Sequence, residues 1–382
     1  MPTGQIPLPF GDATVLSVIE APPRRRAPAP AKLALVESPK HAAQLHRGDA
    51  LQSYGAWPSP DMILSDGAYG VGGFPGDPRT PEGLVEWYRP HVEAWSRRAT
   101  PATTLWFWNT EIGWATVHPL LAKHGWEYVQ VVVWDKGIRH IAGNVNGDTI
   151  RQFPVVTEIC VLYRRRLTFE TSSGTMAARE WLRHEWRRAG LALNEANAAC
   201  GVKNAATRKY LTQDWLWYFP PVEMMMMLVN YANSHGERSG RPYFSLNGRS
   251  PLTSAEWTAL RHAWTHQHAL TNVWNHPPLN GSERLKGNGK RSAPRVHNPG
   301  KNATVHLNQK PLAFMRRIVT ASTLPNQIIW EPFGGLCTAA VAAVELGRKA
   351  FAAEQYEDFY RLAVQRLHEA LERGRGQLSD GE

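Results

Sequence analysis

A carboxylate and two adjacent glycines in the C-terminal part of the chain have the types and spacing of a ligand-binding turn. Glu331 follows the apolar segment Ile328–Trp330, and Gly334 and Gly335 come just before a helix-like run of small residues, 339–346. Glycines let a ligand approach the backbone, a helix N-terminus offers free N–H groups, and a carboxylate at a strand end can accept hydrogen bonds from an ammonium group. This pattern is typical of a nucleotide-binding turn.

A second carboxylate, Glu354, ends the next strand-like segment, 349–353. A carboxylate at the end of the second strand of a Rossmann-like half can bond both hydroxyls of a ribose, so Glu354 suits an adenosine moiety. A Gly-rich turn alone is weak evidence, however, and the alternative is a structural β–α turn without a ligand. The neighbouring motifs must decide between the two.

The elements that position these residues alternate between strand-like and helical segments. The apolar runs have strand length, and the segments between them, such as 81–97 and 116–124, have helical length and spacing. This alternation predicts an α/β fold with a mostly parallel sheet and helices on both faces. The predicted strands are 62–64, 104–108, 128–134, 155–163, 328–330 and 349–353.

Composition limits the class of protein. Hydrophobic residues make up 43% of the 382 residues, which is enough for a buried core and excludes a disordered chain. We expect a cytoplasmic protein without a membrane span, because no apolar run approaches about 20 residues. The net charge of +10, with 16 Trp and 11 Tyr, favours a polyanionic partner that contains bases. A basic surface that only aids solubility is the alternative.

The C-terminal motifs resemble the beta-class DNA amino-methyltransferases. Those enzymes carry a QKP segment, a DPF-G-G-type turn and an acidic strand end in this order, here Gln309-Lys-Pro311, Glu331-Pro-Phe-Gly-Gly335 and Glu354. The resemblance implies a Rossmann-like methyltransferase sheet that binds S-adenosylmethionine. It places Glu331 near the amino group of the cofactor's methionine part, Asn308 and Lys310 near its carboxylate, and Glu354 on its ribose; Phe333, Gly334 and Gly335 form the turn. Glu331 replaces the usual Asp, and Leu336 and Cys337 replace small residues.

The N-terminal half resembles the other part of the same family, in the permuted motif order of the beta class. Gly48-Asp49-Ala50 resembles a GD segment, whose Asp contacts the adenine of the cofactor. The tetrapeptide Asp66-Gly-Ala-Tyr69 stands where the family has Asp-Pro-Pro-Tyr or Ser-Pro-Pro-Tyr, and it keeps the acid and the aromatic residue but neither proline. The resemblance makes Asp66, Gly67 and Tyr69 the catalytic residues and also places Asp66 beside the cofactor.

The chemistry explains why such a motif is needed. An exocyclic amine of adenine or cytosine is a poor nucleophile because its lone pair is delocalised into the ring. Asp66 and the carbonyl of Gly67 can each accept an N–H and so draw the nitrogen toward tetrahedral geometry, while Tyr69 stacks on the flipped base. Without the prolines, we expect a loop that is ordered only by cofactor or DNA. A plain turn after a strand is the alternative.

A basic, Trp-rich stretch between the two halves predicts a helical target-recognition insertion. Residues 193–211 have the spacing of a helix, a Gly turn and a second helix, which resembles a helix-turn-helix. In that interpretation Lys203, Asn204, Thr207 and Arg208 face the major groove. An ordinary αα-hairpin with a solvated charged face is the alternative. The basic loop that follows adds the predicted phosphate contacts Lys286, Lys290 and Arg291.

The sequence divides into six predicted segments. They are a flexible Pro/Arg-rich arm (1–40), the catalytic half (41–172), the recognition region (173–275), the basic loop (276–303), the S-adenosylmethionine-binding half (304–372) and a tail (373–382). His262, His266 and His268 include a pair spaced for Zn²⁺, but no Cys or acidic residue stands beside them, so no metal is predicted.

The predicted function is site-specific methyl transfer from S-adenosylmethionine to an exocyclic amine in double-stranded DNA. Cytosine N4 is slightly favoured over adenine N6, because Ser65-Asp66 leaves room for the smaller pyrimidine. The alternatives are a non-catalytic S-adenosylmethionine- or DNA-binding protein with a degenerate catalytic loop, and an enzyme that acts on RNA. The resemblance further implies a homodimer, a cognate restriction endonuclease and association with the nucleoid.

Overall fold

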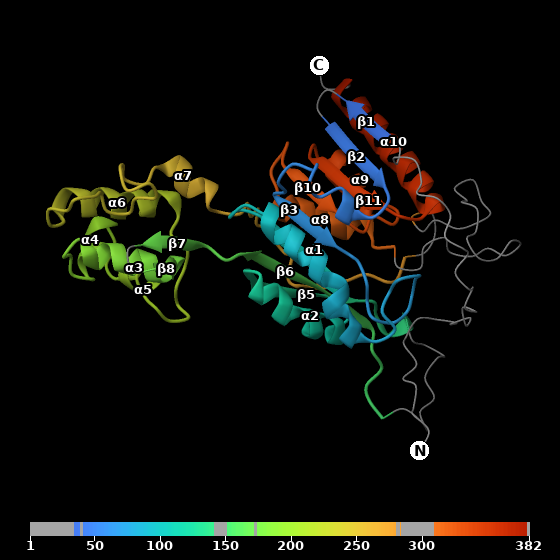
Figure 1. The fold of residues 1–382 in the computed structure, drawn as a ribbon, viewed down its shortest axis with the longest axis horizontal. Helices are drawn as coiled ribbons and strands as arrows, with labels where there is room; N and C mark the ends of the chain where they lie inside the picture. Colours follow the sequence, from blue (N-terminus) through green and yellow to red (C-terminus); the bar gives the residue numbers. More distant parts are fainter. Residues whose placement is uncertain are drawn as a thin grey trace, which may run out of the picture. The chain divides into compact units, whose positions relative to one another are not determined.

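The computed structural model describes residues 34–38, 41–140, 151–171, 174–279, 283 and 309–379 (Figure 1). The chain divides into two compact units. The sheet unit comprises the residues up to 99, 103–163 and those from 263 on, and the helical unit comprises 100–102 and 164–262. The helical unit thus begins and ends earlier than the predicted recognition region, 173–275.

Within the described residues, a nine-stranded sheet forms the centre of the sheet unit, in the order β1-β2-β11-β10-β3-β4-β6-β5-β9. β1 and β2 pair antiparallel, whereas β2–β11, β11–β10, β10–β3, β3–β4 and β5–β9 are parallel. This arrangement confirms the predicted mostly parallel sheet. The strands are β1 (Ala34–Ser38), β2 (His41–Arg47), β3 (Met62–Ser65), β4 (Thr104–Asn109), β5 (Trp126–Asp135), β6 (Thr157–Arg165), β9 (Val273–Asn275), β10 (Ile328–Glu331) and β11 (Lys349–Glu354).

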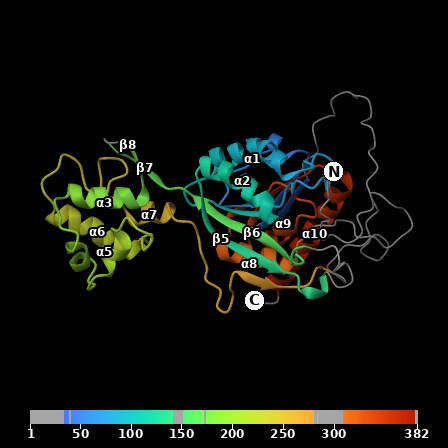
Figure 2. The same ribbon diagram turned by 90° about the horizontal axis from the view of Figure 1, so that it is seen from below.

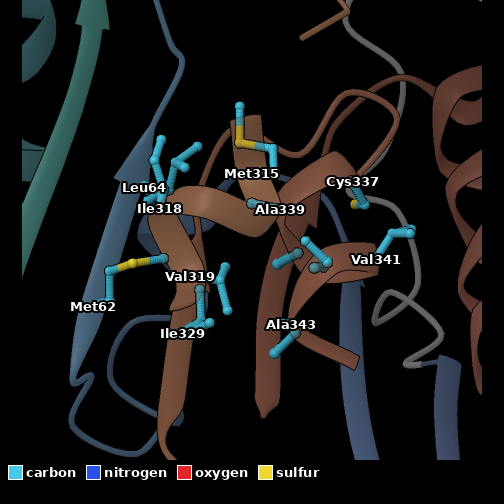
Figure 3. Close-up of a cluster of buried hydrophobic side chains, with 14 of the residues drawn as sticks. Met62, Leu64, Met315, Ile318, Val319, Ile329, Cys337, Ala339, Val341 and Ala343 are labelled. Atoms are coloured by element: carbon cyan, nitrogen blue, oxygen red, sulfur yellow. The ribbon is translucent and has the colours of Figure 1, made fainter. Parts of the chain in front are cut away.

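Helices cover both faces of this sheet, as Figure 2 shows for α1 and α2 on one side and α8 on the other. Successive side chains of a strand point to opposite faces. Met62 and Leu64 of β3 therefore pack against α8, α9 and α10, while Ile63 packs against α1 and α2. Figure 3 shows the first of these cores, where Leu64, Ile318 and Ile329 meet the small residues of α9. The helices are α1 (Leu84–Arg98), α2 (Glu111–Lys123), α8 (Leu312–Ser322), α9 (Thr338–Glu345) and α10 (Glu357–Ser379).

The junction between β10 and β3 determines where a ligand can bind. From β10 the chain crosses through α9 to β11 on one side, and from β3 it crosses through α1 to β4 on the other side. Open α/β sheets bind ligands at such a switch point, outside the carboxyl ends of the strands. In the parallel register Trp330 pairs with Ile63, so Glu331 at the end of β10 and Asp66 after β3 emerge at the same edge. The permuted motif order is what brings these two ends together.

The helical unit has a core of its own. Trp181, Trp186 and Trp257 are fully buried there together with Met225 and Leu228. The short antiparallel strands β7 (Thr168–Thr171) and β8 (Gly174–Ala177) pair in this unit. Its helices are α3 (Ala178–Arg188), α4 (Glu195–Ala199), α5 (Ala205–Tyr210), α6 (Val222–His235) and α7 (Ser254–Ala259).

Two elements of the structure cross boundaries that the sequence suggested. The arm was expected to reach residue 40, but residues 34–38 form β1 because they pair with β2 along their whole length. The tail was expected from residue 373, but α10 continues to Ser379. The structure does not describe the other arm residues or nearly all of the basic loop. Four predicted site residues therefore lie outside the described residues: Lys286, Lys290, Arg291 and Asn308. None of the described helices is long and apolar enough to cross a membrane.

Candidate active site

Asp66 lies in a cluster of buried charges at the carboxyl edge of the sheet. The ammonium group of Lys310, just before α8, lies 2.9 Å from Asp66 Oδ1, 2.9 Å from Glu158 Oε1 and 3.0 Å from the Tyr69 hydroxyl. That hydroxyl lies 2.8 Å from Asp66 Oδ1 and 2.9 Å from Glu158 Oε1. The second oxygen of Glu158 binds Lys136 Nζ at 3.0 Å. Two carboxylates and the ammonium group of Lys310 thus surround the hydroxyl of Tyr69, and Lys136 binds the other oxygen of Glu158.

Electrostatics distinguish the two carboxyl groups of this cluster. Burial raises the pKa of Asp66 above its ordinary value; Lys310 opposes the rise and Glu158 adds to it. Burial also disfavours ionisation of Glu158, but Lys310 and Lys136 outweigh it and bring the pKa of Glu158 to about 2. Glu158 therefore stays ionised, whereas Asp66 is the carboxyl group of the pair that binds a proton more readily.

The loop of the predicted catalytic motif is held by packing and hydrogen bonds within the protein. The carbonyl of Ala68 accepts hydrogen bonds from Tyr88 Oη at 3.0 Å and Asn109 Nδ2 at 2.9 Å. The carboxylate of Asp77 accepts bonds from the backbone N–H groups of Tyr69 and Gly70, at 3.2 and 2.9 Å. These contacts restrain the loop in the absence of the two prolines.

Glu331 stabilises the start of α9. It is 5% exposed, and its two oxygens accept hydrogen bonds from the backbone N–H groups of Ala339 at 3.1 Å and Ala340 at 2.7 Å. The extra methylene of Glu relative to Asp lengthens its reach toward this helix. Burial raises the pKa of Glu331 to about 8, although these hydrogen bonds and Arg366 oppose the rise.

Glu354 connects the Gly-rich turn to the end of β11. Its carboxylate accepts hydrogen bonds from the N–H groups of Gly335 and Tyr356, both at 2.7 Å, and burial raises its pKa to about 7. Its backbone carbonyl accepts a bond from Gly48 N at 2.9 Å, which brings the GD segment to the same edge. Asp49 caps the short helix η1 (Ala50–Gln52) through Leu51 N at 2.9 Å.

One pocket joins the two halves of the predicted site. Its lining includes Asp66, Lys310 and Glu331 together with the turn residues 333–335. The ring of Phe333 lies against His91 and Trp87, with ring centres 4.9 and 5.1 Å apart. Lys310 lines the pocket, and its ammonium group binds Asp66 and Glu158.

The acids at this edge of the sheet fit S-adenosylmethionine: Glu331 lines the pocket, and Glu354 binds the Gly-rich turn beside it. Glu331 and Glu354 are buried carboxylates whose raised pKa values show that their charge is not fully compensated, and each oxygen can accept a second hydrogen bond. A cationic amino group and ribose hydroxyls are suitable donors for such acceptors. A Cβ on Gly334 would lie 2.8 Å from Cys337 Sγ and 2.9 Å from the carbonyl oxygen of Ala353, so only glycine lets the turn pack this closely.

The predicted DNA-binding residues divide into two kinds. Lys203, Asn204 and Arg208 are exposed in the turn between α4 and α5 and on α5. Thr207 instead joins the two helices, since its hydroxyl donates to the carbonyl of Leu193 at 2.7 Å and its N–H donates to Asn197 Oδ1 at 3.1 Å. The structure therefore does not place Thr207 with the three exposed residues.

Sequence reasoning missed Glu158, Lys136 and Asp77. Glu158 begins the apolar run of β6, and Lys136 directly follows the apolar strand β5. A charged residue bordering a buried strand was the available signal, because such charges are rarely buried unless paired. Asp77 lay in a Gly- and Pro-rich segment and gave no such signal.

The fold and the site together define a class: a permuted Rossmann-like domain with an acid from each half at one pocket. Residues 60–365 match the DNA methylase family model of N6/N4 methyltransferases. Because this match covers most of the sequence, the chain belongs to that family, whose members use S-adenosylmethionine.

Two curated relatives match shorter segments. The chain is 32% identical over 120 residues to the type II methyltransferase M2.MboI of Moraxella bovis, covering 30% of this chain and 42% of the relative. It is 30% identical over 124 residues to the DNA adenine methyltransferase YhdJ of Escherichia coli K12, covering 32% and 40%. The match thus spans less than half the length of either relative. The crystal structure of the M1.HpyAVI–SAM complex aligns over 85% of this chain and 98% of its own, at 13% identity and a TM-score of 0.45.

Proposed function

We propose that this protein transfers a methyl group from S-adenosylmethionine to an exocyclic amine of a base flipped out of double-stranded DNA. The observation that carries the proposal is the shared pocket, in which Asp66 of the catalytic half lies beside Glu331 and the Gly-rich turn of the other half. Membership of the N6/N4 methylase family supports the same activity.

The roles of the residues follow from their chemistry. When bound, S-adenosylmethionine supplies an electrophilic methyl group. Asp66 accepts an N–H of the target amine, with the Gly67 carbonyl as the second acceptor, so that the nitrogen lone pair becomes available. The nitrogen gains the methyl group and loses one proton, and Asp66 can take that proton because its pKa is raised.

The cofactor would be held by carboxylates and by the turn. Glu331 would receive the amino group, Glu354 the ribose hydroxyls and Asp49 the adenine amino group, with Phe333, Gly334 and Gly335 forming the wall. Asn308 would lie near the carboxylate of the cofactor's methionine part, as the resemblance implies. Lys310 acts on Asp66 in this proposal, because its ammonium group lies 2.9 Å from that carboxylate.

We slightly favour cytosine N4 as the target, because Ser65-Asp66 leaves room for the smaller pyrimidine. Adenine N6 is the second candidate, since one relative at 30% identity is a DNA adenine methyltransferase. The non-catalytic alternative is motivated mainly by the two missing prolines. The hydrogen bonds to Ala68 and Asp77 hold the loop without those prolines and so make this alternative less favoured. A homodimer, a cognate restriction endonuclease and nucleoid association remain predictions from the resemblance.

Transfer of label from S-adenosylmethionine to genomic DNA and to total RNA, followed by mass spectrometry of the nucleosides, tests this function. We expect label in DNA only, as N4-methylcytosine. Label found only as N6-methyladenine would show that adenine, not cytosine, is the target base, and the proposed methyl transfer to DNA would stand. Label confined to RNA, or bound cofactor without any transfer, would overturn the proposal.

A further inference from the structure

Glu158 and Lys136 have no task in the reaction as described so far. Both side chains are 8% exposed, and they join β6 to the end of β5 through an ion pair of 3.0 Å. Burying charges is costly even when they are paired, and well-packed apolar residues often stabilise a fold equally well or better. A purely structural function therefore does not explain why charged residues stand at these positions next to Asp66.

Glu158 competes with Asp66 for Lys310. The ammonium group lies 2.9 Å from a carboxylate oxygen of each. Glu158 has a second cation in Lys136, whereas among the described residues Asp66 forms an ion pair with Lys310 alone. The hydroxyl of Tyr69 lies within 2.9 Å of both carboxylates and carries a single proton, so it can donate to only one of them at a time.

We propose that Glu158, held by Lys136, is a positioning residue that prevents Lys310 from pairing fully with Asp66 and so keeps the Asp66 carboxylate available to the target amine. This inference rests on the proposed function. Geometry assigns the two acids different tasks, because Asp66 is 17% exposed and lines the pocket, whereas Glu158 is 8% exposed and does not. The low pKa of Glu158 and the raised pKa of Asp66 agree with this division.

Other groups around Asp66 belong to several elements. Lys310 and Glu158 are the nearest charges, and Lys136 lies behind Glu158. Among the described residues, the remaining titratable groups that interact with Asp66 are Tyr69 of its own loop, Tyr88 of α1, Cys160 of β6 and Glu331 of β10. Burial raises the pKa of each of these four groups, so their ionisation does not compete with Asp66 at acidic pH.

The pH dependence of methyl transfer at saturating DNA and cofactor tests the inference. Activity should decline toward acidic pH as Asp66 becomes protonated. In Glu158→Gln, Lys310 pairs with Asp66 alone, so this acid limb should move to lower pH by about one unit or more. In Lys136→Met, one positive charge is lost and Glu158 attracts Lys310 more strongly, so the limb should move to higher pH. Opposite shifts would show that both charges act on Asp66, because a general loss of folding stability does not move the limb in opposite directions.

The double variant Glu158→Gln/Lys136→Met removes one charge of each sign and decides the matter if a single variant does not fold. Glu158 is the nearer of the two to Asp66, so the acid limb of the double variant should still lie below that of the wild type. An unchanged limb with a uniformly lower rate would overturn the inference, as would single-variant shifts in the same direction. Wild-type protein that transfers no methyl group at any pH would instead contradict the proposed function.

Discussion

At the level of single residues, packing explains why glycine replaces proline in the catalytic motif. A Cβ on Gly67 would lie 2.7 Å from two ring carbons of Phe333 and 2.8 Å from the hydroxyl oxygen of Tyr88. These distances are shorter than ordinary contacts, and Phe333 belongs to the cofactor half. The glycine thus lets the two halves of the site approach closely, and Ala68 is anchored by Tyr88 and Asn109.

Gly67→Ala should therefore impair both stability and activity. The added methyl group must displace the Phe333 ring or the loop, and overpacking of this kind costs about 1–3 kcal/mol. Chemical denaturation measures the loss, and methyl-transfer assays should show a lower rate. Gly55→Ala is the matched control, because no atom lies within 4 Å of the Cβ position there. Equal effects at both positions would contradict this explanation, and Phe333→Leu should partly rescue Gly67→Ala.

At the level of helices and strands, the start of α9 depends on Glu331. Cys337, the residue before the helix, has a positive φ of 52°, which L-residues rarely adopt. The carboxylate of Glu331 binds two N–H groups of the first turn and so compensates for part of this unfavourable backbone conformation. The strand end, the turn and the helix therefore form one unit whose stability depends on the charge of an acid buried within it.

Stability should fall with rising pH because of Glu331. Its folded-state pKa of about 8 lies above its ordinary value of 4.5, so the folded protein binds the proton more tightly than the unfolded chain. The contribution is present below about pH 4.5 and is lost as pH rises through 8, by up to about 5 kcal/mol at about 1.4 kcal/mol per pKa unit. Denaturation at pH 5 and pH 9 measures it.

Glu331→Gln should flatten this dependence. Some slope will remain because Glu354, whose pKa is about 7, acts in the same direction. The exposed Glu86 is the control position, and Glu86→Gln should keep the wild-type slope. A Glu331→Gln variant with an unchanged slope would show that Glu331 is not the group responsible.

At the level of the entire protein, the helical unit carries exposed cationic residues beside a helix pair. If it contacts DNA, removing the charges of Lys203 and Arg208 should weaken DNA binding. The slope of the logarithm of the binding constant against the logarithm of the salt concentration should become less steep by about one for each residue changed. Cofactor binding should not change, since its predicted residues lie in the sheet unit. Arg187→Ala, an exposed arginine on α3, is the control. Equal losses in this control would argue against a specific DNA-binding surface.

Local motifs made part of this site predictable. Asp66, Glu331 and Glu354 each follow an apolar strand, so their position at one sheet edge could be inferred once the strands were recognised. The cluster of Glu158, Lys136 and Lys310 could not, because it depends on which strands are neighbours in space. The hydrogen bonds of Glu331 to α9 likewise depend on the exact path of the turn.

The extent of some elements also depended on partners that are distant in sequence. Residues 34–38 lie in a Pro- and Ala-rich region and form a strand through pairing with β2. Thr207 has the position of a groove-facing residue in a helix-turn-helix, yet its hydroxyl bonds within the helix pair. In both cases tertiary contacts outweighed the local pattern.

The decisive experiment for the proposed catalytic role of Asp66 is methyl transfer from labelled S-adenosylmethionine to DNA by the wild type and by Asp66→Ala, with cofactor binding measured in parallel. Glu86→Gln serves as the control for loss of a carboxylate outside the pocket. We predict that Asp66→Ala binds the cofactor but transfers the methyl group at least about 100-fold more slowly, as expected for loss of a catalytic hydrogen-bonding group. Transfer by Asp66→Ala at the wild-type rate would contradict this role and the mechanism built on it.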